Sequence, residues 1–273
     1  MKNGLNLWRK FEVGVFAGPE IVEDGLVLAL DAGNAKSYPG SGTAWTDLSG
    51  NGNTGTLVNG VGFDSGNLGS LVFDGVNDYV VHTSNLTAIN NITNSSSFTF
   101  SSTFKLNAFP TVQTAAITGL LMKGSYNPSY GMNLTYSGSS GGFRTQAQIY
   151  YGLRNLTGTA GVTQGYGFFN RTSNTLIQLG QWYKVDMVHE FSGTTHTLRL
   201  YINGNLDRQD TATDALYPIN FQNTESLGIN FRILGGNFLY SNADIASYSI
   251  YNRALTASEI QQNFVALRGR FGI

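Results

Sequence analysis

The strongest constraint on the fold is a pair of alternating segments between residues 181 and 205. From Tyr183 to Phe191, every second residue is mainly apolar and the residues between are mostly polar. Successive side chains of a strand point to opposite faces, so this pattern predicts a strand with one buried face. Ser192–Thr195 supplies turn residues, and Leu198–Ile202 resumes the alternation. The stretch therefore predicts a half-buried antiparallel hairpin that forms a wall of a β-sandwich.

The rest of the chain reads as short strands separated by turn residues, followed by one helix. Strands are expected at residues 25–31, 71–73, 78–82, 97–106, 131–136, 146–151, 165–169, 226–234 and 243–251, and residues 207–224 are expected to form a loop. In residues 97–106 the phenylalanines predict a buried face, and Thr99, Ser101, Thr103 and Lys105 predict a solvated one. Thr256, with Glu259 three residues later, predicts a capping box for a helix over residues 256–268.

These elements predict an all-β chain: a two-sheet antiparallel β-sandwich jelly roll with an N-terminal extended arm and one short C-terminal helix packed across it.

Only 12% of residues are charged, against roughly 25% in ordinary soluble domains. With 16 basic and 17 acidic residues there is no positive field for nucleic acid. No stretch reaches the length of a membrane span, and the start lacks the apolar run of a signal peptide. The absence of cysteine excludes disulfides and thiol chemistry.

Residues 1–24 differ from the body at residues 25–273 and are interpreted as a docking arm. The arm is too short to fold alone and contains five apolar candidates for contact with a partner. These are Trp8, Phe11, Val13, Val15 and Phe16. The alternative is that the arm packs along its own domain as an extra edge strand.

Six motifs, taken in order, resemble laminin-G-like, concanavalin-A-like jelly-roll domains over roughly residues 25–266. They are Trp45–Asn53, Phe73–Tyr79, Phe98–Phe100, Gln181–Tyr183, Leu200–Gly204 and Ile250–Thr256 with Glu259–Ile260. The resemblance implies the fold more than the function, because this scaffold carries lectins, glycanases, adhesion modules and virion proteins.

The resemblance also raises the question of a structural calcium ion. In many members an acidic residue that helps to bind calcium stands where this chain has Ala246. Asp244, two positions earlier on the same face, is the candidate substitute ligand.

The stretch Gly25–Leu57 further resembles structural proteins of tailed bacteriophages, including marine ones. This narrower resemblance implies a virion location, with the arm fastened to other virion proteins of a capsid or tail. We expect no nucleic acid and no membrane as partners, and a homo-oligomer is compatible with the low charge.

The sequence contains no recognisable catalytic constellation. Glycanases of this fold use a Glu-x-Asp-x-x-Glu cluster that sets two carboxylates about 5–5.5 Å apart, and the chain has no such cluster. The nearest pair, Asp186 and Glu190, is interpreted as two solvated strand charges. His82, His189 and His196 lack metal spacing, and His189 is interpreted as a hydrogen-bonded packing residue.

The Tyr- and Gly-rich region from Met122 to Phe169 is the predicted recognition surface, since sugars stack on aromatic rings. The candidates for binding a glycan or a protein partner are Tyr126, Tyr130, Tyr150, Tyr151 and Tyr166, each with core packing as the alternative. We therefore predict a non-enzymatic virion component, such as a capsid decoration protein or part of a tail fibre. The alternative is a carbohydrate-binding adhesion module that recognises host-surface glycans.

Overall fold

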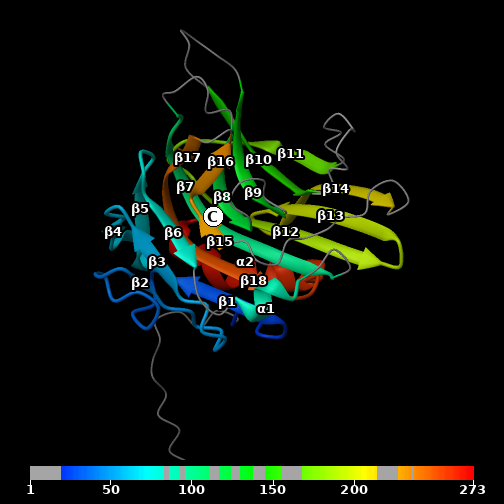
Figure 1. The fold of residues 1–273 in the computed structure, drawn as a ribbon, viewed down its shortest axis with the longest axis horizontal. Coiled ribbons are helices and arrows are strands. Elements are labelled where there is room, and N and C mark those ends of the chain that lie inside the picture. The colour runs from blue at the N-terminus through cyan, green and yellow to red at the C-terminus, as the bar shows by residue number, and fades with distance from the viewer. Residues whose placement is uncertain are drawn as a thin grey trace, which may run out of the picture.

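The chain forms a sandwich of two antiparallel sheets, seen in a computed structural model (Figure 1). The structure describes residues 20–82, 86–92, 96–110, 117–123, 130–137, 145–154, 168–213, 227–234 and 237–273. Within them, each of the two large sheets has eight strands. Strands β2 to β6 lie at one end of the molecule, and β11, β13 and β14 at the other.

Sheet A contains the predicted hairpin. Its order is β14 (Asn205–Thr213), β13 (Thr195–Ile202), β12 (Trp182–Ser192), β7 (Phe98–Ala108), β18 (Asn242–Tyr251), β5 (Ser70–Asp74) and β4 (Gly62–Asp64), with β1 (Leu26–Asp31) also paired to β18. Strand β12 pairs with β13 in register from Val185–Ile202 to Ser192–Thr195, as the sequence predicts.

Sheet B faces sheet A across the core. Its order is β11 (Phe168–Ile177), β10 (Gln146–Arg154), β9 (Tyr130–Ser137), β8 (Ile117–Lys123), β15 (Leu227–Ile229), β6 (Tyr79–His82), β3 (Gly55–Val58) and β2 (Ala44–Trp45). The remaining elements are the hairpin β16 (Phe231–Leu234)–β17 (Asn237–Tyr240), the 3-10 turn η1 (Gly66–Leu68), and helices α1 (Thr87–Asn90) and α2 (Ala257–Phe271). The prediction of an all-β sandwich with one C-terminal helix is confirmed.

Asp47, in the first of the six motifs, fastens its loop to β1. One carboxylate oxygen accepts from the backbone N–H groups of Ala29 and Ser49, both at 2.9 Å. The other accepts from the Ser49 hydroxyl at 2.8 Å and from the Asn53 N–H at 2.9 Å. Four donors satisfy the buried carboxylate, so this motif has a structural role.

Helix α2 begins and ends with the signals that its sequence contains. The Thr256 side chain accepts from the Glu259 N–H at 3.3 Å, and the Glu259 carboxylate accepts from the Thr256 N–H at 2.8 Å. At the other end, Gly272 adopts a left-handed conformation that closes the helix. The helix continues to Phe271, three residues beyond the predicted end.

The outer face of sheet A is covered by α2, and this corrects one expectation. Thr99, Ser101 and Thr103 of β7 were expected to face water, yet all three are buried. Two apolar clusters hold the helix against the sheet at its two ends. They consist of Val22, Val188, Tyr201, Tyr251, Leu255 and Ile260 at one end, and Trp182, Ala246 and Phe271 at the other.

Two further elements differ from the sequence-based expectations. Residues 205–213, mostly within the expected loop, form strand β14, because the tight turn at Asn203–Gly204 returns the chain antiparallel to β13. The strands on either side of the Asp74–Asn77 turn belong to different sheets: β5 lies in sheet A and β6 in sheet B. This turn therefore crosses from one sheet to the other.

Candidate functional site

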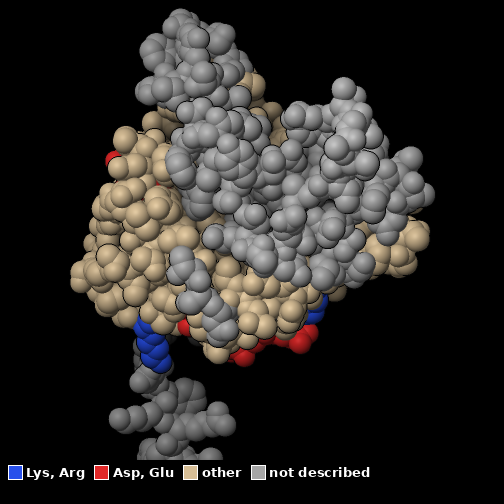
Figure 2. Space-filling model, viewed as in Figure 1, with Lys and Arg blue, Asp and Glu red and all other residues tan. Residues whose placement is uncertain are grey.

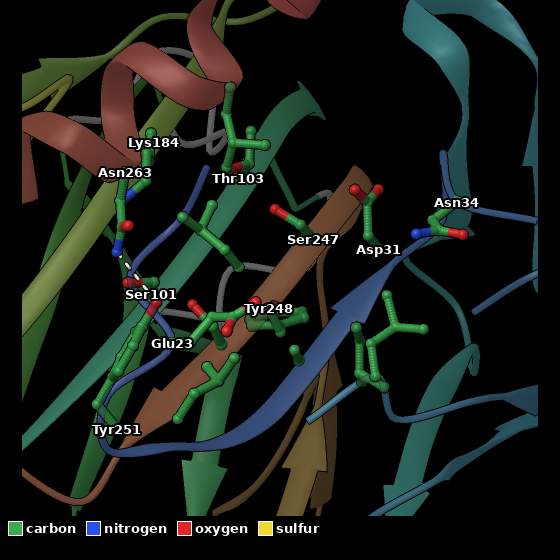
Figure 3. A pocket seen from close by; sticks show the side chains of 17 residues that line it. Glu23, Asp31, Asn34, Ser101, Thr103, Lys184, Ser247, Tyr248, Tyr251 and Asn263 are labelled. Carbon is green, nitrogen blue, oxygen red and sulfur yellow. Dashed lines mark hydrogen bonds between the residues drawn. The ribbon is translucent and has the colours of Figure 1, made fainter. Parts of the chain in front are cut away.

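A pocket of about 320 Å³ lies between α2 and the outer face of sheet A (Figure 3). Ile21 and Glu23, in the segment before β1, line one side, and Asn263 and Leu267 of α2 line another. The pocket is thus bounded by elements from both ends of the described chain. It occupies the space between the two apolar clusters that hold the helix.

Six polar residues on three neighbouring strands lie together beneath α2, and we call them the polar array. All of them except Asp186 line the pocket. Alternate residues of β18, β7 and β12 point outward, and the strand register places them in two rows. The rows are Ser247, Thr103 and Lys184, and Ser249, Ser101 and Asp186. Directly opposed residues of antiparallel strands have Cβ atoms about 4.5–5.5 Å apart, so the array is compact.

Lys184 and Asp186 form a buried ion pair within the array. Their side chains are 2% and 0% exposed, and Lys184 Nζ contacts Asp186 Oδ1. The Ser101 hydroxyl donates to the same oxygen. Among the described residues, Asp186 is the hydrogen-bond partner of Nζ, so two of the three ammonium donors remain for another acceptor. Lys184 itself lines the pocket.

Two hydroxyls of the array are available to a ligand. Within the described part of the chain, the side chains of Thr103 and Ser247 have no hydrogen-bond partner, and both line the pocket. A hydroxyl both donates and accepts, so these groups suit a ligand that also does both.

The wall of the pocket is fixed by hydrogen bonds. Asn263 donates to the Tyr251 hydroxyl at 3.0 Å, drawn as a dashed line in Figure 3, and its side-chain oxygen accepts from the Val22 N–H at 2.8 Å. Burial raises the pKa of Tyr251 to about 12, so the phenol keeps its proton at neutral pH and donates to the Val22 carbonyl.

Charged groups stand at the rim. Both carboxylate oxygens of Asp31 accept from Arg270 Nη1, at 2.9 and 2.8 Å. Glu23 is exposed, and Figure 3 shows its side chain near the centre of the view. On the face of the molecule in Figure 2 the described atoms are mostly uncharged, in agreement with the low charged fraction.

The predicted tyrosine surface is only partly described. Tyr126 and Tyr166 lie outside the described residues, and Tyr130 begins β9, with no description of its side chain. Tyr150 is half-buried on the outer face of sheet B. Its neighbour Tyr151 points the opposite way and is 0% exposed. For Tyr151, the alternative of core packing is therefore the correct one.

The arm candidates Trp8, Phe11, Val13, Val15 and Phe16 also lie outside the described residues. The last residues assigned to the arm belong to the body. Val22 is 8% exposed, and Gln262 donates to the Glu20 carbonyl at 2.8 Å. Residues 20–24 therefore pack against the body, and the interpretation of residues 1–19 as a docking arm lies outside the described residues.

Asp244, the candidate calcium ligand, has protein partners in this structure. Its carboxylate lies 2.6 Å from Lys105 Nζ and accepts from Asn107 Nδ2 at 2.7 Å. Among the described residues, no group of three or more His, Cys, Asp or Glu side chains is placed to hold a metal ion. A calcium ion at Asp244 would have to compete with Lys105.

The interpretation of Asp186 and Glu190 as two solvated charges is wrong for Asp186, which is fully buried under α2. Glu190 is exposed and pairs with Arg199 at 2.8 Å. His189 is a buried packing residue, as predicted, with Nδ1 3.0 Å from the Ser96 carbonyl. Its Nε2 lies 2.9 Å from His196 Nδ1.

Sequence reasoning missed the polar array, although a signal was present. Three strands carry polar pairs at alternate positions, in Ser101–Thr103, Lys184–Asp186 and Ser247–Ser249. Such pairs ordinarily face water. Together with an amphipathic helix expected to pack across the sandwich, they could have indicated a covered polar site.

Residues 73–261 match the family model described as the concanavalin A-like lectin/glucanases superfamily. The comparison with curated proteins finds no match. None of the helices in the described residues combines the length and hydrophobicity that a membrane span requires.

Solved structures share the fold at low sequence identity. The binding domain of Paraclostridial mosquitocidal protein 1 gives a TM-score of 0.60 at 15% identity, covering 89% of this chain and 52% of that one. The ligand-binding domain of botulinum neurotoxin serotype D, in complex with N-acetylneuraminic acid, gives 0.60 at 15%, covering 89% and 51%. Domain 4 of an extracellular arabinanase from Geobacillus stearothermophilus, in complex with arabinotriose, gives 0.57 at 16%, covering 89% and 100%. The chain thus spans about half the length of the mosquitocidal-protein and neurotoxin domains and all of the arabinanase domain.

Proposed function

The chain belongs to the concanavalin A-like lectin/glucanases superfamily, and we propose that it is a non-catalytic, lectin-like module that binds carbohydrate in the pocket beneath α2. The observation that carries this proposal is the polar array, in which the hydroxyls of Thr103 and Ser247 have no partner among the described residues. Buried polar groups are normally satisfied, so such hydroxyls in a pocket call for water or a ligand.

The similar structures support a binding role. Two of the three described above were solved with a sugar, N-acetylneuraminic acid in one and arabinotriose in the other. At 15% and 16% identity they support the class of ligand through the shared fold, without assigning individual residues.

The carboxylates at the pocket argue against hydrolysis. A retaining glycanase needs one carboxylate as nucleophile and a second as proton donor. Here Asp186 is held by Lys184 and Ser101, and its second oxygen is buried. Asp31 is held by Arg270, which leaves Glu23 as the lining carboxylate without an ion-pair partner among the described residues.

A glycan array tests the proposal directly, followed by calorimetry on each hit. The variant Thr103→Val/Ser247→Ala removes the two unpartnered hydroxyls with little change of shape. It should weaken binding by about tenfold or more, since each lost hydrogen bond contributes roughly 0.5–1.5 kcal/mol. The matched control, Thr56→Val/Ser137→Ala, makes the same changes at exposed positions of sheet B and should bind as wild type. An array without any signal would overturn the proposal.

We also propose that the module is carried on a virus particle, with residues 1–19 as its attachment to other virion proteins. The apolar residues of this segment and the tailed-phage resemblance of Gly25–Leu57 favour this location. Residues 20–24 pack on α2, so the attachment would lead directly from the side of the body that holds the pocket. Deletion of residues 1–19 should abolish incorporation into particles while leaving sugar binding intact. Normal incorporation of the truncated chain would contradict an attachment role.

A further inference from the structure

We infer that the pocket beneath α2 selects neutral sugars over sugars that carry a carboxylate. This inference rests on the proposed carbohydrate function and concerns the charge of the ligand. It follows from the balance of charged groups around the polar array and from the chemistry of the array itself.

Lys184, the one cation among the described residues that line the pocket, is already neutralised. The Lys184 ammonium is paired with Asp186, and both are buried. A carboxylate ligand would gain little from this pair, because Asp186 lies beside the ammonium that would attract it. The two free donors of Nζ can still donate to a neutral sugar hydroxyl.

The rim adds negative charge. Asp31 is compensated by the two hydrogen bonds from Arg270, whereas Glu23 has no ion-pair partner among the described residues. Within the described part of the chain, the charged residues that line the pocket, with their direct partners, are Lys184 and Arg270 against Asp186, Asp31 and Glu23. Two positive and three negative groups leave a net charge of −1 at the site, which repels an anionic ligand.

The floor of the pocket matches the hydroxyls of a sugar. Ser101, Thr103, Ser247 and Ser249 form two cross-strand pairs, Thr103 opposite Ser247 and Ser101 opposite Ser249. Paired positions are about 5 Å apart, and positions two residues apart on a strand are about 7 Å apart. This rectangle has the scale of one sugar ring. Leu26 and Leu267 add apolar contact surface for the C–H groups of that ring.

Matched sugar pairs give a direct test. Glucose and glucuronic acid, or galactose and galacturonic acid, differ in that a carboxylate replaces the hydroxymethyl group outside the ring. Short oligosaccharides of each kind should be titrated into the full chain by calorimetry at low and moderate salt. We expect the neutral member of each pair to bind at least about tenfold more tightly, with a smaller difference at higher salt.

Glu23→Gln removes the uncompensated charge, so it should reduce the difference in affinity between the neutral and the acidic sugar of each pair. Glu20→Gln makes the same change on a nearby exposed glutamate that does not line the pocket, and should leave the difference unchanged. Equal or tighter binding of the acidic sugars would overturn the inference while the lectin function stands. Sugar binding that Thr103→Val/Ser247→Ala leaves unaffected would place the sugar outside the pocket, and would overturn both the inference and the site given in the proposed function. If neither the neutral nor the acidic sugars bind, both the inference and the proposed function are wrong.

Discussion

The side-chain oxygen of Asn263 accepts a hydrogen bond from the backbone N–H of Val22 at 2.8 Å, across 241 positions of the sequence. The amide nitrogen of Asn263 donates to the Tyr251 hydroxyl at 3.0 Å, and that hydroxyl donates to the Val22 carbonyl, also at 3.0 Å. One buried amide therefore joins the segment before β1, the last strand of sheet A and helix α2. All three elements contribute to the pocket.

Replacing this amide should destabilise the chain and loosen the segment before β1. Asn263→Leu removes both hydrogen bonds and leaves the Val22 N–H without its partner, so we expect a loss of about 1–3 kcal/mol in the free energy of unfolding. Urea denaturation measures the loss, and hydrogen exchange should show faster exchange at Val22. Gln261→Ala, at an exposed position of the same helix, should change stability by less than about 0.5 kcal/mol. Slow exchange at Val22 in the leucine variant would contradict this role.

Two truncations should distinguish how much residues 1–19 and residues 20–24 contribute to the stability of the body. Deleting residues 1–19 should leave the unfolding temperature close to that of the full chain, because the contacts of Val22 with Asn263 and Tyr251 remain. Deleting residues 1–24 removes those contacts and exposes the apolar cluster beneath Val22, so it should lower the unfolding temperature by several degrees. Calorimetric scans of both proteins test the boundary. Equal unfolding temperatures would show that residues 20–24 add nothing to the body.

The ion pair under α2 should show strong coupling in a double-mutant cycle. Asp186→Leu leaves the buried Lys184 ammonium without its counter-charge, and Lys184→Met does the same to the carboxylate. Each single change should cost about 3–5 kcal/mol, whereas the double variant should recover most of that loss. Chemical denaturation of the four proteins gives the coupling energy. Additive losses would mean that the two charges are solvated separately.

The same ion pair shows what the sequence could not predict. The hairpin and the capping box of α2 are local patterns, so Tyr183–Phe191 and Thr256–Glu259 predicted their elements directly. The burial of Asp186 depends on a helix about 70 positions later in the chain, and no neighbouring residue signals it. The sequence pattern around Asp186 and Glu190 therefore indicates two solvated charges, which is wrong for Asp186.

Strand β14 and the pair Tyr150 and Tyr151 illustrate two other limits of prediction from sequence. Residues 205–213 contain mostly polar side chains, and their strand conformation comes from pairing with β13, for instance Leu198 with Asp210. Tyr150 and Tyr151 are adjacent and chemically identical, so the sequence could not choose which ring faces the core. The register of β10 decides this and buries Tyr151.

His82 lies in sheet B, across the core from sheet A. Its surroundings favour the neutral form of the imidazole ring. Its Nδ1 lies 2.8 Å from the Asn53 carbonyl, which can only accept, so Nδ1 carries the proton. Its Nε2 is buried and has no partner among the described residues. A Cβ added at Gly55 would lie 3.0 Å from the ring, which shows how closely the backbone packs against it.

Stability should therefore fall as the pH falls through the range in which a free histidine gains its proton. Burial lowers the pKa of His82 from 6.5 to about 4, so between these values the unfolded chain binds a proton that the folded chain does not. The stabilisation is complete above the unfolded pKa, and we expect about 3 kcal/mol to be lost between pH 7 and pH 4 through this group. Urea denaturation across that range measures the slope. His82→Gln cannot titrate, so its stability should fall less steeply than that of the wild type, whatever its value at neutral pH. Parallel curves for the two proteins would show that His82 is not the group responsible.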